Sequence, residues 1–128
     1  MATGRISAEF GEFLRKKRIE RGITLTELAT TIGITPAYLC DIEKANRPAP
    51  TNRLKQMSEK LGLLGEDKDI FFDLAAETMG NYEDLNSYLG EVKEARIALR
   101  RARDTGFTPD DWRRFTDYVE KKKGDIHD

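Results

Sequence analysis

The chain contains 128 residues, 38% of them hydrophobic and 35% charged, with a formal net charge of −1 and a mean hydropathy of −0.64. The lack of a long apolar run argues against a membrane-spanning helix and a signal peptide, so we expect a cytoplasmic protein without membrane contact. One cysteine, Cys40, and one histidine, His127, are too few for a disulfide or a cysteine-rich zinc site, and we expect no enzyme, no metal and no cofactor.

Apolar residues recur at helical spacing along the chain and no strand pattern appears, so the sequence predicts an all-α fold. The first helix is predicted from about Ser7 to Arg21 and ends at Gly22. Its apolar positions are Phe10, Phe13, Leu14 and Ile19.

Two short helices follow, and side-chain chemistry marks where each begins. Thr24 and Glu27 have the spacing of a capping box, in which the hydroxyl and the carboxylate satisfy free backbone N–H groups. Gly33 supplies the left-handed conformation that commonly ends a helix. Thr35 caps the next helix, with Pro36 at its first position. Two helices joined by so short a turn predict a helix-turn-helix, whose second helix, 35–45, reads the major groove of DNA.

Two more helices are predicted before residue 80. Thr51 is expected to cap the first, from Asn52 to about Leu61, and the second covers residues 68–79. Their expected core positions are Leu54, Met57, Ser58 and Leu61, and Ile70, Phe71, Leu74 and Met79.

An amphipathic extension follows the stretch GNYED at 80–84. A last helix is predicted to begin with Thr108 as its cap and Pro109 at its first position. The apolar residues of the extension are Leu85, Tyr88, Leu89, Val92, Ala95 and Leu99, with Gly90 as a candidate break, and then Trp112, Phe115 and Val119. We expect a DNA-binding module at 7–79, a helical extension at 80–123 and a flexible tail at 124–128. The extension either makes a homodimer or folds back onto the module.

Charge is distributed unevenly along the chain. Residues 1–64 carry 11 Lys/Arg against 7 Asp/Glu, whereas residues 65–128 carry 11 against 16. A basic first half fits a surface that faces phosphates, and an acidic second half fits solvent or a protein. Double-stranded DNA is therefore the expected partner, and the acidic half is a candidate site for a protein partner.

Residues 9–76 resemble the five-helix DNA-binding domain of Xre/Cro and lambda-repressor-like transcriptional regulators. The resemblance rests on the stretches LRKKRIERGITLTELATTIGITPAYLCDIEKANR and PTNRLKQMSEKLGL. It implies a lambda-repressor-like fold for these residues, to which the apolar pattern adds a helical C-terminal extension, and it implies a repressor function and an ion pair between Arg18 and Glu43. The family usually has Gly where this chain has Ala45, so we expect the left-handed helix cap to shift to Asn46.

Helical geometry predicts which side chains face DNA. Leu39 and Ile42 must face the core, so the opposite side of the second short helix carries the expected base contacts Pro36, Ala37, Asp41 and Lys44. For Asp41, a solvated carboxylate or a partner for Lys44 is the alternative to a base contact. The expected phosphate contacts are Thr24, Thr26, Thr35, Tyr38, Asn46, Arg47, Asn52 and Arg53.

Two other functions fit parts of the sequence. The main alternative is an antitoxin-type regulator, which neutralises a protein partner and controls its own operon. A small-ligand pocket around Arg96, Arg100, Trp112 and Arg113 is less favoured, because arginines on amphipathic helices are mostly solvated or salt-bridged.

Overall fold

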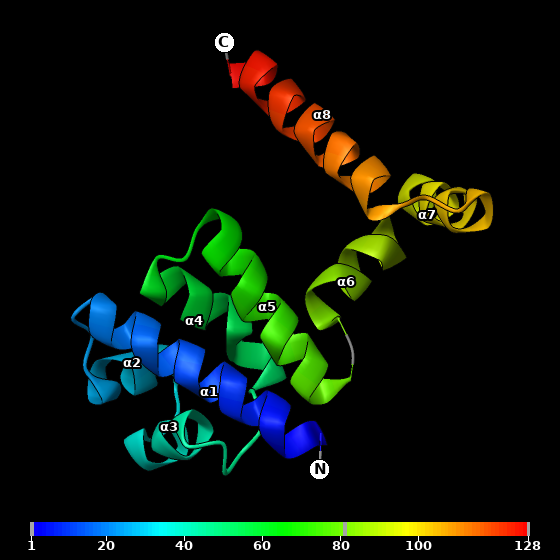
Figure 1. The fold of residues 1–128 in the computed structure, drawn as a ribbon. Coiled ribbons are helices and arrows are strands. Elements are labelled where there is room, and N and C mark those ends of the chain that lie inside the picture. The colour runs from blue at the N-terminus through cyan, green and yellow to red at the C-terminus, as the bar shows by residue number, and fades with distance from the viewer. Residues whose placement is uncertain (1, 81, 128) are drawn as a thin grey trace. The chain divides into compact units, whose positions relative to one another are not determined.

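The computed structural model describes residues 2–80 and 82–127, which are helical apart from short connections (Figure 1). Backbone contacts divide the chain into two compact units, Met1–Asn86 and Ser87–Asp128, which we describe separately. Within the described ranges, no helix combines the length and apolar character that a membrane crossing requires.

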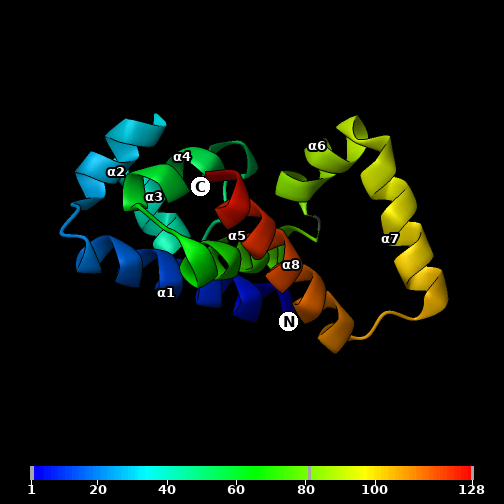
Figure 2. The same cartoon turned by 90° about the horizontal axis from the view of Figure 1, so that it is seen from above.

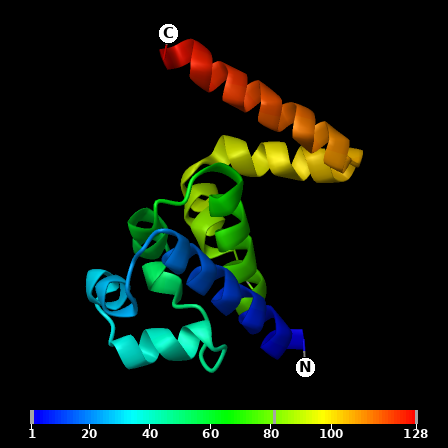
Figure 3. The same cartoon turned by 60° about the vertical axis from the view of Figure 1, so that its left-hand side comes forward.

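The described residues of the first unit form five complete α-helices and one short 3₁₀ turn, followed by the first residues of α6 (Glu83–Glu91). These are α1 (Ala2–Glu20), α2 (Leu25–Ile32), α3 (Pro36–Glu43), the 3₁₀ turn η1 (Thr51–Arg53), α4 (Leu54–Leu61) and α5 (Gly65–Met79). Helix α1 packs against α5 and α3, and α2 packs against α3 and α4. Figure 2 shows α1 alongside α5, and Figure 3 shows α2 and α3 at a steep angle to each other.

One hydrophobic core joins all five helices. Phe10 of α1 and Phe71 of α5 are the largest fully buried side chains, with ring centroids 5.3 Å apart. The other core residues are Leu14, Leu28, Ala29, Ile32, Leu39, Ile42, Ala49, Leu54, Met57, Leu61, Leu63 and Ala75. Since neither α2 nor α3 is long enough to be stable alone, this shared core holds the pair in place.

Two residues predicted to face the core lie on the surface instead. Ile19 is 56% exposed and Ile70 is 37% exposed. Ile19 follows the buried Leu14 by five residues, which at about 3.6 residues per turn places it well away from the buried stripe of α1. On α5 the buried side passes through Phe71 and Ala75, and Ile70 lies beside it. The side chain of Met79 lies outside the described residues.

Several helix ends differ from the prediction. Helix α1 begins at Ala2 rather than near Ser7, and α5 begins at Gly65, three residues before the predicted start. The prediction that Thr51 caps a helix is wrong: it opens η1, in which the Arg53 N–H donates to the Pro50 carbonyl at 2.9 Å, and neither η1 nor α4 has a side-chain cap. A tight 3₁₀ turn after proline provides the entry to α4 in place of that cap.

Helix α1 approaches the end of α3 closely at Gly11. A Cβ atom added at Gly11 would lie 2.5 Å from the Glu43 carbonyl oxygen and 2.7 Å from that of Ile42. Backbone atoms cannot yield as a flexible side chain can, so any larger residue must push the two helices apart.

The second unit takes in the end of α6 (Glu83–Glu91), all of α7 (Lys93–Thr105) and α8 (Pro109–His127). The break between α6 and α7 lies at Val92, and Gly90 is inside α6, contrary to its expected role as the break. Arg96 donates from Nη1 to the carbonyls of Leu89 and Gly90 at 2.6 and 3.1 Å, so it satisfies the C-terminal end of α6. Helix α8 continues through residues 124–127, which the sequence predicts as a flexible tail.

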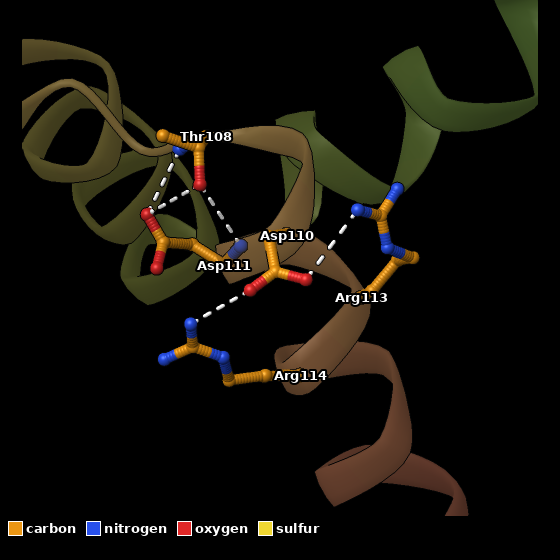
Figure 4. Close-up of polar contacts among 5 residues, drawn as sticks. All are labelled: Thr108, Asp110, Asp111, Arg113 and Arg114. Atoms are coloured by element: carbon orange, nitrogen blue, oxygen red, sulfur yellow. Dashed lines mark hydrogen bonds and ion pairs between the residues drawn. The ribbon is translucent and has the colours of Figure 1, made fainter.

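A reciprocal cap starts α8, as Figure 4 shows. The Asp111 N–H donates to Thr108 Oγ1 at 3.2 Å, and the Thr108 N–H donates to Asp111 Oδ2 at 2.9 Å. The backbone N–H of Thr108, followed by its hydroxyl, lowers the pKa of the Asp111 carboxyl. Because the pKa of the Asp111 carboxyl is lower in the folded chain than in the unfolded chain, the ionised cap stabilises α8 at pH values above the ordinary carboxyl pKa. This stabilisation is lost as the pH falls through the lowered pKa.

Very little of the second unit is buried. Among its described residues only Ala102 is buried. The large exposed apolar residues are Tyr88, Ile97, Leu99, Phe107, Phe115, Tyr118 and Val119. So much apolar surface on so small a unit is typical of a surface that packs against another chain or domain.

We predict that Gly11→Ala destabilises the first unit by about 2 kcal/mol, the usual cost of forcing an extra methyl group into a packed contact. Thermal or urea unfolding of the full chain measures the change. Gly90→Ala is the matched control, because Gly90 lies within a helix and a Cβ there meets nothing within 4 Å. Equal stability of the two variants would show that α1 and α3 do not depend on this close approach.

Candidate nucleic-acid interface

Helices α2 and α3 are held in a helix-turn-helix by the caps at their ends. The Thr24 hydroxyl accepts from the Glu27 N–H at 3.0 Å, and the Thr35 hydroxyl accepts from the Tyr38 N–H at 3.1 Å. The Glu27 carboxylate differs from the predicted capping box, because it accepts from the Thr24 hydroxyl rather than from a backbone N–H. Gly33 ends α2 at φ 74°. Apart from the Glu27 carboxylate, the two helices begin and end as the sequence indicates at Thr24, Gly33 and Thr35.

Helix α3 separates a buried side from an exposed one. Leu39 and Ile42 are fully buried. The four side chains expected to contact bases, which are Pro36, Ala37, Asp41 and Lys44, are exposed or, for Asp41, half-buried. Cys40 is a free, half-buried thiol. The outward side of α3 is thus mostly small or apolar, with one acidic and one basic group.

The end of α3 departs from the expected geometry. Ala45, and not Asn46, takes the left-handed conformation, with φ 65°. The Asn46 N–H donates to the Asp41 carbonyl at 2.8 Å and the Ala45 N–H to the Ile42 carbonyl at 3.1 Å. These two bonds form a Schellman motif, and they satisfy the last carbonyls of α3 well enough to hold an L-residue in a strained conformation. The predicted shift of the cap to Asn46 is therefore wrong.

Arg18 and Glu43 form a two-bond ion pair between α1 and α3. Arg18 donates from Nε to Glu43 Oε2 at 2.7 Å and from Nη2 to Oε1 at 3.0 Å. Its Nη1 donates to the Ile23 carbonyl at 3.0 Å. The side chains are only 13% and 6% exposed, and the bond to Glu43 raises the pKa of the Arg18 guanidinium. A paired and hydrogen-bonded charge at this depth fixes α3 to α1.

Six of the eight residues expected at phosphates differ in how far they are exposed. Five polar side chains are exposed around α2, α3 and η1: Thr24, Thr26, Thr35, Asn46 and Asn52. Arg53 is half-buried, and its Nη1 donates to the Ile32 carbonyl, so it satisfies the C-terminal end of α2. Its guanidinium lies beside Gly33. The structure therefore gives Arg53 a role inside the module.

Arg47 and Tyr38 meet on the surface of α3. The Arg47 Cζ atom lies 4.8 Å from the Tyr38 ring centroid. Arg47 Nε lies 3.7 Å from Asp41 Oδ2, so Asp41 pairs with Arg47 and not with Lys44. Arg47, which follows the C-terminal end of α3, therefore contacts both Asp41 and, nearer the start of the helix, Tyr38.

Comparison with known proteins agrees with this geometry. The helix-turn-helix family model matches residues 14–67. The HTH-type transcriptional regulator SinR of Bacillus licheniformis is 31% identical over 114 residues, which cover 88% of this chain and 94% of SinR. This chain belongs to the Xre-type helix-turn-helix family of DNA-binding transcriptional regulators. Because the match is longer than the first unit, the similarity to SinR extends into the second unit.

Other relatives differ in how much of the chain they share. The HTH-type transcriptional regulator YqaF of Bacillus subtilis (strain 168) is 38% identical over 74 residues, which cover 57% of this chain and 93% of YqaF. The crystal structure of the clp gene regulator ClgR from Corynebacterium glutamicum is 25% identical, covers 72% of this chain and 88% of its own, and has a TM-score of 0.46.

Sequence reasoning missed two contacts that shape this helix-turn-helix module. Gly11 lies inside the first predicted helix with no role assigned to it, although its lack of a side chain allows α1 to touch α3. Arg21 donates from Nε to the Leu61 carbonyl at 2.9 Å and satisfies the end of α4. A basic residue that reaches a helix end far along the chain leaves no local signal. A glycine inside an otherwise apolar helix face does leave one, because it is costly there without a packing reason.

The acidic excess lies in a narrower region than the halves of the sequence suggest. Residues 65–86, which include α5, carry seven Asp/Glu and one Lys, whereas residues 87–128 carry nine Asp/Glu and ten Lys/Arg. Glu66, Asp69, Asp73 and Glu77 are exposed along α5. The acidic excess therefore lies in α5 and at the start of α6, and not in the second unit, where the charges nearly balance.

Side chains considered for a small-ligand pocket on the second unit make local contacts with their neighbours. No group of three or more His, Cys, Asp or Glu side chains among them could hold a metal ion. In the region of the less favoured ligand pocket, Arg96 caps α6, Arg113 pairs with Asp110 at 3.4 Å, and Trp112 packs against Phe107. These side chains are engaged in local contacts.

We predict that Ala45→Gly stabilises the module by about 0.5–1 kcal/mol, because the relief of left-handed strain exceeds the added flexibility of glycine. Urea unfolding midpoints measure the change. Asn46→Gly is the matched control, and it should give no stabilisation because Asn46 has a negative φ. If Ala45→Gly proves no more stable than Asn46→Gly, the end of α3 does not hold the strain described above.

Proposed function

We propose that this chain represses transcription in the bacterial cytoplasm by binding operator DNA as a homodimer, with the outward side of α3 in the major groove. The observation that most supports this is the division of α3 itself. Leu39 and Ile42 are fully buried, while the opposite side chains are presented outward by a helix that caps and an ion pair hold in place. A recognition helix needs this arrangement. The proposal includes no catalytic activity.

The proposed base contacts follow from donor and acceptor chemistry. Lys44 can donate to guanine N7 and O6, and Ala37 can contact a thymine methyl group. Asp41 can accept only from a donor such as the cytosine N4 amino group. Pro36 stands at the start of α3 and shapes its approach to the groove. This set is short, so we expect phosphate contacts to supply much of the affinity.

The proposed phosphate contacts surround the recognition helix. Thr24 and Thr35 mark the N-terminal ends of α2 and α3, where backbone N–H groups favour an anion. Thr26, Asn46 and Asn52 are exposed and carry short polar side chains. Such groups position a protein on the duplex without reading its sequence.

Repression requires fewer contacts of this architecture than activation does. A repressor needs only to occupy its operator, whereas an activator must also contact the transcription machinery. A DNA-binding module that dimerises through the exposed apolar surface of the second unit can occupy an operator by binding two half-sites. This argument supports a repressor over an activator.

A homodimer would cover the apolar surface of the second unit. Its exposed Phe115 and Val119 lie one turn apart on α8, and Leu99 is exposed on α7. A second copy of the same unit offers a self-complementary apolar surface, as two-fold dimers require. Two-fold DNA-binding dimers bind half-sites about one DNA turn apart.

The same apolar surface supports a second candidate function, an antitoxin-type regulator that binds a different protein. In that case α7 and α8 would cover the partner's apolar site rather than a second copy. The acidic side chains of α5 would be a separate surface, because the second unit itself is nearly neutral. Oligomeric state distinguishes the two candidates.

We predict that the full chain binds a selected DNA site with steep salt dependence and that Lys44→Ala weakens this binding. If Lys44 contacts a phosphate, the slope of log affinity against log salt should fall by about 1. If it contacts guanine, the loss should depend on sequence. Gel shifts at several salt concentrations measure both effects. Lys68→Ala is the control, because Lys68 is an exposed lysine among the acidic residues of α5.

If the Lys44→Ala variant binds DNA with unchanged affinity and an unchanged salt slope, the outward side of α3 does not contact DNA. Thermal melting of both variants shows that neither has unfolded.

We predict that the double variant Phe115→Glu, Val119→Glu converts the full chain from a dimer to a monomer, because two charges in an apolar contact cannot be solvated there. Sedimentation velocity measures the change. Lys121→Glu is the control, since it adds negative charge to another side of α8. A monomeric wild-type chain would contradict the dimer and favour the second candidate.

A further inference from the structure

Tyr38, Asp41 and Arg47 form a three-residue cluster at the edge of the outward side of α3, where Tyr38 is half-buried and also packs against the core. The Arg47 guanidinium lies over the Tyr38 ring, with Cζ 4.8 Å from the centroid. Its Nε lies 3.7 Å from Asp41 Oδ2. Tyr38 and Asp41 are three residues apart, so they lie on the same side of the helix and contact Arg47 from two directions.

The turn after α3 brings Arg47 back to this side. Ala45 reverses the chain with φ 65°, and the Asn46 N–H donates to the Asp41 carbonyl at 2.8 Å. Arg47 follows directly and extends back along the helix toward Tyr38. A guanidinium held by a ring and a carboxylate has lost much of its freedom before DNA arrives, which reduces the entropy cost of binding.

The chemistry of the cluster favours a base over a phosphate. One face of the guanidinium is covered by Tyr38 and its Nε edge faces Asp41, which leaves the two terminal nitrogens as a paired donor. A phosphate at that edge would also approach the Asp41 carboxylate, and like charges repel. Guanine presents two neutral acceptors, N7 and O6, and its paired cytosine presents an N4 donor that a carboxylate can accept.

We propose that Arg47 and Asp41 together read one G·C base pair, with Tyr38 as the positioning residue. Arg47 donates to guanine N7 and O6, and Asp41 accepts from cytosine N4. This assigns Arg47 and Tyr38 to base recognition in place of the phosphate contacts expected from the sequence. The inference rests on the proposed function, because it requires α3 to lie in the major groove.

Selection of binding sites from random double-stranded DNA tests this with the full chain. The variants are Arg47→Lys, Asp41→Asn and Tyr38→Leu, with Tyr38→Phe to restore the ring and Lys68→Ala as the surface control. Arg47→Lys keeps the charge that a phosphate needs but loses the paired donor that guanine needs. Thermal melting of each variant confirms that it is folded.

We expect the wild-type motif to contain a G·C pair whose preference falls roughly 5- to 150-fold in Arg47→Lys, while other positions keep theirs. Asp41→Asn and Tyr38→Leu should relax the same position, and Tyr38→Phe should retain more of the preference than Tyr38→Leu. Lys68→Ala should select the wild-type motif.

Two results would overturn the inference, and they differ in what they imply for the proposed function. In the first, Arg47→Lys selects the wild-type motif at every position and loses affinity uniformly. Arg47 would then contact a phosphate, and the proposed function would still stand. Failure of the wild-type chain to enrich any motif would reject both.

Discussion

The contact between α1 and the C-terminal end of α3 is the constraint on which the DNA-binding module depends. At Gly11 the backbone of α1 lies so close to the carbonyls of Ile42 and Glu43 that no larger residue fits. Seven residues later on α1, Arg18 binds the Glu43 carboxylate through two hydrogen bonds in a largely buried site. A helix of eight residues is unstable alone in water, so these contacts and the shared core give α3 its fixed place.

The same end of α3 determines what its outward side can offer to DNA. Glu43 is held by α1, Ala45 reverses the chain in a strained conformation, and Arg47 returns along the helix to Tyr38 and Asp41. A site placed on a rigid helix keeps its geometry before the ligand arrives, which makes recognition more selective. The recognition side and the packing of α1 are therefore parts of one arrangement.

Local chemistry made most of the fold predictable, and contacts between distant segments limited the rest. The caps at Thr24, Thr35 and Thr108, and the left-handed Gly33, involve neighbours within a few residues, so the sequence indicates them directly. The pair of Arg18 with Glu43 could be predicted only from resemblance to a family. Ala45 was predicted wrongly because local propensity favours Asn, whereas the two backbone bonds of the Schellman motif outweigh that propensity. Contacts with DNA stay predictions, since they depend on a partner.

The unfolding free energies of Arg18→Leu, Glu43→Leu and the double variant test the importance of the α1–α3 contact most directly. Each single variant leaves one buried charge unpaired, so we predict a loss of about 3 kcal/mol for each. The double variant removes both charges and should lose far less than the sum of the two, because neither charge is then left buried. Single losses below about 0.5 kcal/mol that simply add in the double variant would show that this ion pair does not hold α3, and would contradict the account.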